Sequence, residues 1–179
     1  MTWQSRRVGV SSLAVLAGIG VGMLVLRRTR RTRGGASVVS ANKEIVRRLI
    51  EGVWGDRNLG LVDELVAQDY VGHDPTQPEP IKGREGFKQF VGMYQSAFED
   101  AAITIDDQIA EGDNVVTRWT GRGTHTGELM GIAPTGKEVT VSGITISRLA
   151  GGKIAEEWEL MDALGMLTQL GAIPQPATA

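Results

Sequence analysis

The stretches GRGTHTGE (residues 121–128), TGK (135–137) and GKIAEEWELMD (152–162) decide the fold of this chain. The first and the last lie in segments that alternate polar and apolar side chains, which predicts β-strands. The TGK triplet follows Pro134 and lacks the upstream glycine and the following helix of a phosphate-binding loop, so it is interpreted as a hairpin turn. The sequence contains no P-loop, dinucleotide-binding fingerprint or nucleophile elbow.

The alternation in residues 154–162 predicts which side chains face the core. In an unbroken strand, Trp158 and Asp162 point to one side of the sheet, whereas Glu157 and Glu159 point to the other. A buried carboxylate beside an indole has a raised pKa, which suits general acid/base catalysis. Asp162 is equally suited to cap the helix predicted over residues 163–170, and the two roles are compatible.

Elements of two kinds follow each other along the chain. Helical spacing of apolar residues predicts three helices at about residues 42–55, 61–66 and 84–99, with Asn42 as a cap and Gly55 as a stop. A period of two then predicts strands around residues 103–105, 115–119, 139–141 and 154–161, with turns at 111–114 and 150–152. This order indicates an α+β domain, in which the helices cover one face of a sheet and leave a concave apolar pocket.

Four motifs resemble one known family. The patterns G-T-H-x-G, G-I-x-P-T-G-K, G-K-I-x-E-x-W-x-x-x-D and L-x-Q-L-G resemble the SnoaL-like polyketide cyclase (ester cyclase) family of the NTF2-like superfamily, over residues 42–174. The resemblance implies an NTF2-like cone, in which N-terminal helices pack on a curved, antiparallel-rich sheet. It also implies cofactor-free acid/base chemistry, an intramolecular aldol reaction on a lipophilic carbonyl substrate, and a homodimer through the exposed face of the sheet.

Six residues are candidates for the site: Asp162, His125 and His73 for catalysis, and Trp158, Trp119 and Tyr94 for substrate binding. In the reaction that the resemblance implies, Asp162 would move the proton, the two histidines would polarise substrate oxygens, and Trp158 would pack the apolar skeleton. Two histidines without metal-ligand spacing predict that no metal is bound.

Each of these candidates has an ordinary structural alternative. A bulge at Gly121 or Gly123 would re-aim His125. His73 is expected in a turn, where Asp74 either holds its imidazole or caps the turn. Tyr94 is also compatible with a place in the core.

Two other functions are compatible with the same predicted pocket. A membrane-tethered binding module would hold a lipophilic molecule without chemistry. A hydrolase of the limonene epoxide hydrolase type would need an Asp-Arg-Asp cluster, but alternation places Arg118 on the face opposite Trp119.

The N-terminus predicts a membrane anchor. Residues 8–26 carry no charge, and seven arginines flank them, two before and five after. We therefore expect an anchor at 1–28, a basic linker at 29–41, the domain at 42–174 and a tail at 175–179. The excess of arginines after the span favours a single-pass protein with its C-terminal domain in the cytoplasm. A cleaved export signal is the alternative.

Charge and cysteine content exclude several classes of function. Residues 42–179 contain 12 Lys and Arg against 21 Asp and Glu, a formal charge of minus nine, so the domain is not expected to bind nucleic acid. The absence of cysteine excludes disulfides and thiol catalysis.

Overall fold

A computed structural model describes residues 28–173 of the chain, with side chains from residue 35 onward. Residues 35–173 belong to one compact unit. The segment predicted to be an anchor, residues 8–26, and the tail, residues 175–179, lie outside the described residues. Between residues 28 and 173, no helix is both long enough and apolar enough to cross a bilayer.

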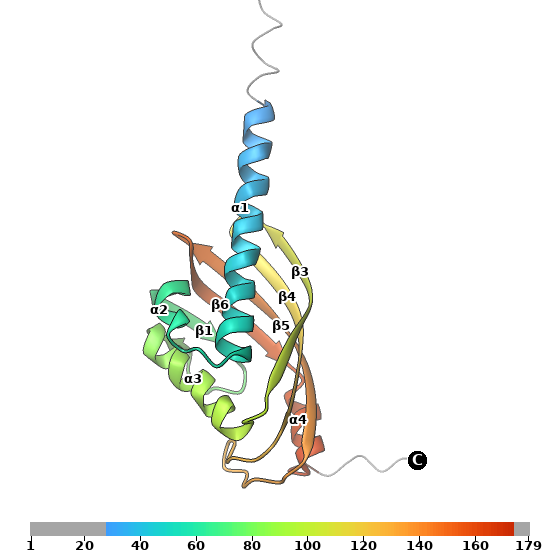
Figure 1. Cartoon of the computed structure of the whole chain (residues 1–179). Coiled ribbons are helices and arrows are strands. Elements are labelled where there is room, and N and C mark those ends of the chain that lie inside the picture. The colour runs from blue at the N-terminus through green and yellow to red at the C-terminus, as the bar shows by residue number, and fades with distance from the viewer. Residues whose placement is uncertain (1–27, 174–179) are drawn as a thin grey trace, which may run out of the picture. The chain divides into compact units, whose positions relative to one another are not determined.

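Helices and strands form the expected α+β fold, but two strands lie between the second and the third predicted helix, where none was expected (Figure 1). The helical elements are α1 (Arg28–Leu49), the π-helical turn η1 (Ile50–Gly55), α2 (Leu61–Leu65), α3 (Gly83–Ala97) and α4 (Ala163–Leu170). The strands are β1 (Val66–His73), β2 (Ile81–Lys82), β3 (Ala102–Glu111), β4 (Asn114–Thr124), β5 (Glu138–Ala150) and β6 (Lys153–Met161).

The first helix is longer than the sequence predicts. Its apolar face, with Val46 and Leu49, is buried as expected, and η1 ends at Gly55. Asn42 is not its cap, because α1 begins at Arg28 and includes the residues predicted as a linker. The Asn42 side chain instead donates a hydrogen bond to the Gly112 carbonyl, at 3.1 Å, and so joins α1 to the β3–β4 turn.

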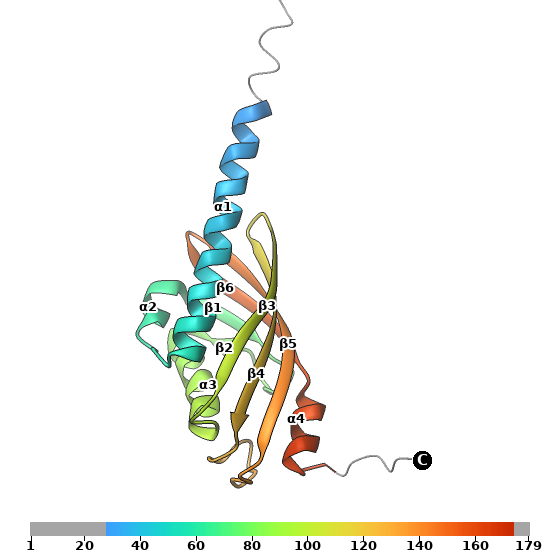
Figure 2. The same ribbon diagram turned by 45° about the vertical axis from the view of Figure 1, so that its right-hand side comes forward.

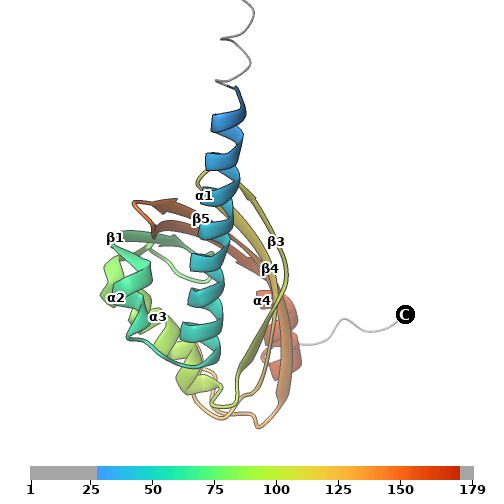
Figure 3. The ribbon, with the colours of Figure 1, turned by 45° about the horizontal axis from the view of Figure 1, so that its top comes forward.

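The six strands form one mixed sheet in the order β2-β1-β6-β5-β4-β3. All neighbours are antiparallel except β1 and β6, which run parallel. Figure 3 shows the sheet curving around the helices that cover its concave face. The strand β1 was not expected: Val66 was assigned to a helix and His73 to a turn. Its burial does not alternate cleanly, and its register with β6 shifts between Val66 and Val71.

A β-bulge in β6 reverses the predicted orientation of its second half. Arg148 of β5 pairs with Glu156, but the next residue of β5, Leu149, pairs with Ile154, so Ala155 is an extra residue. The insertion turns Glu157 and Glu159 toward the helices and leaves Trp158 on the outer face, where 40% of its surface is exposed. The prediction that Trp158 faces the pocket is therefore wrong, since it assumed an unbroken strand.

Two apolar clusters hold the helices on the sheet. One packs the end of α1, η1, α2 and α3 on β1, β4, β5 and β6, and Val53, Val91 and Val115 are among its fully buried residues. The other joins the end of α3, the 125–137 loop and α4, and it contains Phe98, Leu129 and Met166. The helix α4 lies beside the beginning of β5, where Gln169 is hydrogen-bonded to Thr140 (Figure 2). The space between these two clusters is the main cavity.

Candidate functional site

The main cavity, of about 130 Å³, opens between the helices and the concave face of the sheet. Its walls are predominantly apolar and include Trp54, Phe98, Ile103, Trp119, Val141 and Met161. Three ionisable side chains belong to residues that line it: Tyr94, Arg122 and Glu159. Arg122 is exposed. Among the described residues that line the cavity, Glu159 alone carries a carboxyl group.

The Glu159 carboxyl lies in an unusual electrostatic environment. Glu159 pairs with Thr145 of β5, and Thr145 in turn accepts a hydrogen bond of 3.0 Å from the indole of Trp119. Within residues 35–173, no side chain forms an ion pair with Glu159. Burial, followed by the charges of Asp74 and Glu157, raises the pKa of Glu159 to about 8. This carboxyl therefore exchanges a proton near neutral pH.

Glu157, two residues earlier on the same face, is held by hydrogen bonds. Its two carboxylate oxygens accept from the Ser147 hydroxyl at 2.6 Å and from the Tyr70 hydroxyl at 3.0 Å. Burial raises the pKa of Glu157, and these two hydrogen bonds oppose the shift. The pKa of Tyr70 is raised too, first by burial and then by the Glu157 charge. Both oxygens of Glu157 are thus occupied by neighbours in the sheet.

Asp74 is a third carboxylate in this region. It follows β1, and one of its oxygens accepts a hydrogen bond of 2.6 Å from the Thr76 amide. Asp74 therefore caps the turn, which was one of its two predicted roles, and does not hold His73. Its other oxygen is buried and has no hydrogen-bond partner in the described part of the chain.

Trp119 and Tyr94 line the cavity, as predicted. Trp119 can lie against the sheet because its partner in β5 is Gly143, where a Cβ atom would overlap the indole. Tyr94 packs edge-on against Trp54 and Phe90. Burial raises the pKa of the Tyr94 hydroxyl, and the charges of Asp74 and Glu159 add to the shift. Tyr94 therefore remains a neutral hydrogen-bond donor near Glu159.

Comparison with known proteins assigns the family. The model of the SnoaL-like polyketide cyclase family matches residues 44–170. The chain belongs to this family. Among SnoaL-like relatives, the nogalonic acid methyl ester cyclase of Streptomyces nogalater is 30% identical over 111 residues, which cover 62% of this chain and 83% of the relative. The aklanonic acid methyl ester cyclase DnrD of Streptomyces peucetius is 28% identical, covering 74% and 92% of the two chains.

Solved structures of similar proteins agree with the SnoaL-like fold. TsrD from Streptomyces laurentii is 28% identical with a TM-score of 0.68, over 75% of this chain and 97% of that chain. IdmH from Streptomyces antibioticus is 34% identical with a TM-score of 0.63, over 73% and 98% of the two chains. The NTF2-like α+β fold is therefore shown.

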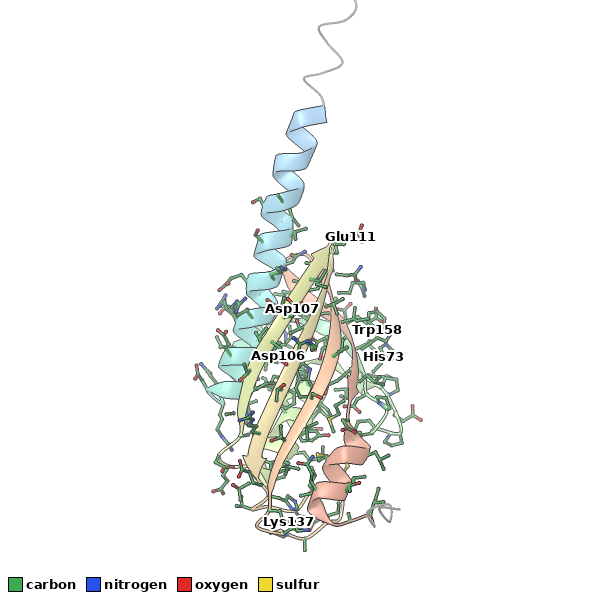
Figure 4. The ribbon with its side chains drawn as sticks, turned by 90° about the vertical axis from the view of Figure 1, so that its right-hand side faces the viewer. His73, Asp106, Asp107, Glu111, Lys137 and Trp158 are labelled. Carbon is green, nitrogen blue, oxygen red and sulfur yellow. The ribbon has the colours of Figure 1, made fainter. Side chains whose placement is uncertain are left out.

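Trp158 and His73 lie side by side on the outer face of this SnoaL-like domain (Figure 4). Their rings stack with centroids 5.4 Å apart and an angle of 11° between the planes. The His73 Nε2 atom lies 3.0 Å from a Glu156 oxygen, and Arg148 binds the other oxygen at 2.8 Å. These contacts lower the pKa of Glu156. Trp158 therefore packs on His73. The lining of the main cavity includes neither residue, whereas His73 lines a second, smaller cavity.

Asp162 is exposed and caps α4. Its carboxylate accepts a hydrogen bond of 2.8 Å from the Gly165 amide, as the capping interpretation predicted. The residues around the main cavity include Glu159 and Met161 but not Asp162. The catalytic role assigned to Asp162 stays a prediction, which the experiment below tests against Glu159.

His125 is fully buried directly after β4. The Thr135 amide donates to its Nδ1 atom at 3.2 Å, and the ring lies 5.4 Å from that of Phe98. The register of β4 with β5 continues to Thr124, so no bulge re-aims the histidine. His125 anchors the 125–137 loop and does not line the cavity, and its catalytic role stays a prediction.

Two further arrangements bear on the chemistry. Arg118 is exposed and pairs with Asp106 at 3.0 Å, so it does not supply the arginine that an epoxide hydrolase cluster needs. In the described part of the chain, no group of three or more His, Asp or Glu side chains is placed to hold a metal ion.

Proposed function

We propose that this SnoaL-like protein catalyses a cofactor-free intramolecular aldol reaction on a lipophilic carbonyl compound, with Glu159 as the general acid/base. The observation that supports it is one carboxyl with a pKa raised to about 8 in a predominantly apolar cavity. Catalytic groups work best when their pKa lies near the operating pH.

The reaction requires one proton to be removed and returned. The Glu159 carboxylate takes a proton from the carbon next to one carbonyl, and the resulting enolate carbon attacks a second carbonyl carbon to close the ring. The proton then passes from Glu159 to the new alkoxide oxygen, so the product is an isomer of the substrate. The Tyr94 hydroxyl, with its raised pKa, would donate a hydrogen bond to a substrate oxygen.

The environment of Glu159 disfavours a substrate with a free carboxylate. Asp74 and Glu157 place additional negative charge near Glu159, which would repel a free carboxylate. Two relatives are named as cyclases of nogalonic acid methyl ester and aklanonic acid methyl ester, in which an ester replaces the acid. We propose that this chain acts on a polyketide ester of the same kind.

The experiment compares two substitutions that each remove one acid. Ring closure of both methyl esters is followed by chromatography with the wild-type chain, with Glu159→Gln and with Asp162→Asn. We expect Glu159→Gln to lower kcat by at least about 100-fold, because general acid/base groups contribute about 10²–10⁴-fold. Asp162→Asn should retain most of the activity, since asparagine also caps helices.

The opposite result, with activity lost in Asp162→Asn and kept in Glu159→Gln, would restore Asp162 and overturn the proposal. Tight binding of both esters by the wild-type chain without any turnover would favour the alternative function, a binding module.

We also propose a homodimer that forms through the outer face of the sheet. Ile109, Val116, Ile146 and Trp158 are successive partners across β3, β4, β5 and β6, and they form an apolar row. Ile109 is 65% exposed and Ile146 is 39% exposed. An exposed apolar row of this kind is typical of a protein–protein interface. A single-pass membrane location likewise remains our proposal, and it rests on residues 8–26 alone.

A further inference from the structure

A second, smaller cavity of about 20 Å³ lies next to the main one. The two cavities share Trp54 and Glu159 in their linings. This volume is close to that of one water molecule, which requires about 10–15 Å³. A ligand in the main cavity could therefore place one small terminal group in the second.

Three carboxylates face this small space: Asp74, Glu157 and Glu159. In residues 35–173, none of them forms an ion pair with a basic side chain. Glu157 is bonded by Tyr70 and Ser147, as described above. The other two carboxylates remain available to a ligand.

Asp74 provides the strongest indication of a ligand. Asp74 is only 8% exposed, and its second oxygen has no hydrogen-bond partner among the described residues. A buried acceptor of this kind is costly unless a donor satisfies it, and more so when it is charged. Tyr70 and Glu159 line the same small cavity as Asp74. The charge of Asp74 accordingly contributes to the raised pKa of both groups.

Most of the remaining wall is aromatic. Gly72, Ile81 and His73 complete it, and the imidazole of His73 is hydrogen-bonded to Glu156. Trp54 lies edge-on to Phe87 and Phe90, with centroid distances of 6.5 and 6.1 Å, and Tyr70 lies 5.2 Å from Phe87. Aromatic rings attract cations as well as apolar groups. Carboxylates and aromatic rings together match a positively charged group that is attached to an apolar body.

We propose that the small cavity is a subsite for a primary ammonium group, carried by a ligand whose apolar body occupies the main cavity. An –NH3⁺ group is about the size of water, and it has three donors for the free oxygens of Asp74 and Glu159. A trimethylammonium group is too large for about 20 Å³. The subsite concerns binding alone and does not depend on the proposed reaction.

The test uses three probes with the same six-carbon chain: hexylamine, hexan-1-ol and hexyltrimethylammonium. Their binding to the full chain is followed by tryptophan fluorescence, because Trp54 and Trp119 line the main cavity. We expect hexylamine to bind at least about tenfold more tightly than the other two, as charge-assisted hydrogen bonds are about twice as strong as neutral ones.

Substitution of Asp74 tests the assignment of the subsite. Asp74→Asn keeps an acceptor for the Thr76 amide and removes the charge, so it should weaken hexylamine about tenfold and leave hexan-1-ol unchanged. Asp106→Asn makes the same chemical change at the exposed pair with Arg118 and should leave all three affinities unchanged.

Equal affinities of hexylamine and hexan-1-ol for the wild-type chain would overturn the proposal without any variant. Hexyltrimethylammonium that binds as tightly as hexylamine would also overturn it, as would an Asp74→Asn variant that keeps the full preference for hexylamine.

Discussion

The raised pKa of Glu159 predicts how the stability of the protein depends on pH. The group titrates near 4.5 in an unfolded chain and at about 8 in the folded protein. An acid whose pKa is raised by folding favours the folded state below the unfolded pKa, and this contribution is lost as the pH rises through the folded pKa. The wild-type protein should therefore lose stability from about pH 4.5 to pH 8, and Glu159→Gln should be free of this loss.

The size of the effect follows from the shift. Each unit of pKa corresponds to about 1.4 kcal/mol, so the full shift sets a ceiling of about 5 kcal/mol. The cavity is open to water, which screens charge, and we expect roughly half of this value. Glu159→Gln should thus be more stable than wild type by roughly 2–3 kcal/mol above pH 8, and about equal to it near pH 4.

The assay is urea unfolding of both proteins across this pH range, with the difference in unfolding free energy plotted against pH. Glu156→Gln is the matched control, since it makes the same change three residues earlier on the outer face. Contacts with His73 and Arg148 lower the pKa of Glu156. The ionised Glu156 side chain therefore stabilises the folded state above the ordinary glutamate pKa, and this stabilisation is lost as the pH falls. This control should therefore be less stable than wild type at neutral pH. A difference between Glu159→Gln and wild type that does not change with pH would refute the reasoning.

Two further predictions concern packing and assembly. Gly143→Ala should destabilise the protein by about 1–3 kcal/mol, measured by urea unfolding, because its methyl group would displace the Trp119 indole. The control is Gly92→Ala in α3, where a methyl group meets no atom within 4 Å, and this change should be neutral or stabilising. Equal effects of the two substitutions would contradict this packing. Residues 38–179 should sediment as a dimer at micromolar concentration and as a monomer with Ile146→Glu, whereas a monomeric wild type would contradict the proposed interface.

Most of the architecture could be predicted because its patterns are local. The helical spacing around Val46 and Val91 and the alternation along β4 and β5 are properties of short segments, and the turns contain glycines that adopt positive φ at residues 112, 151 and 152. β1 escaped prediction because only Val66, Tyr70 and Gly72 are buried along it, with no period of two throughout. Its parallel pairing with β6 joins segments that are far apart in the sequence.

The candidate site was predicted in part for the same reason. Trp119 and Tyr94 lie in regular elements, so their periodicity places them correctly. Glu159 was assigned to the outer face, because the bulge at Ala155 depends on the pairing of β5 with β6 and has no clear signature in GKIAEEWELMD. The alternation of Glu157, Glu159 and Met161 was visible, and only its direction was reversed. Asp74 reaches the site through a turn, where spacing alone does not place a side chain.

The most direct test of the role of Glu159 is deuterium exchange at the carbon that would lose the proton. Aklanonic acid methyl ester is incubated in heavy water with each protein, and the deuterium gained by the remaining ester is measured by mass spectrometry. If Glu159 removes this proton, wild type and Asp162→Asn will exchange it faster than buffer, and Glu159→Gln will match buffer. Exchange by Glu159→Gln at the wild-type rate would contradict the account.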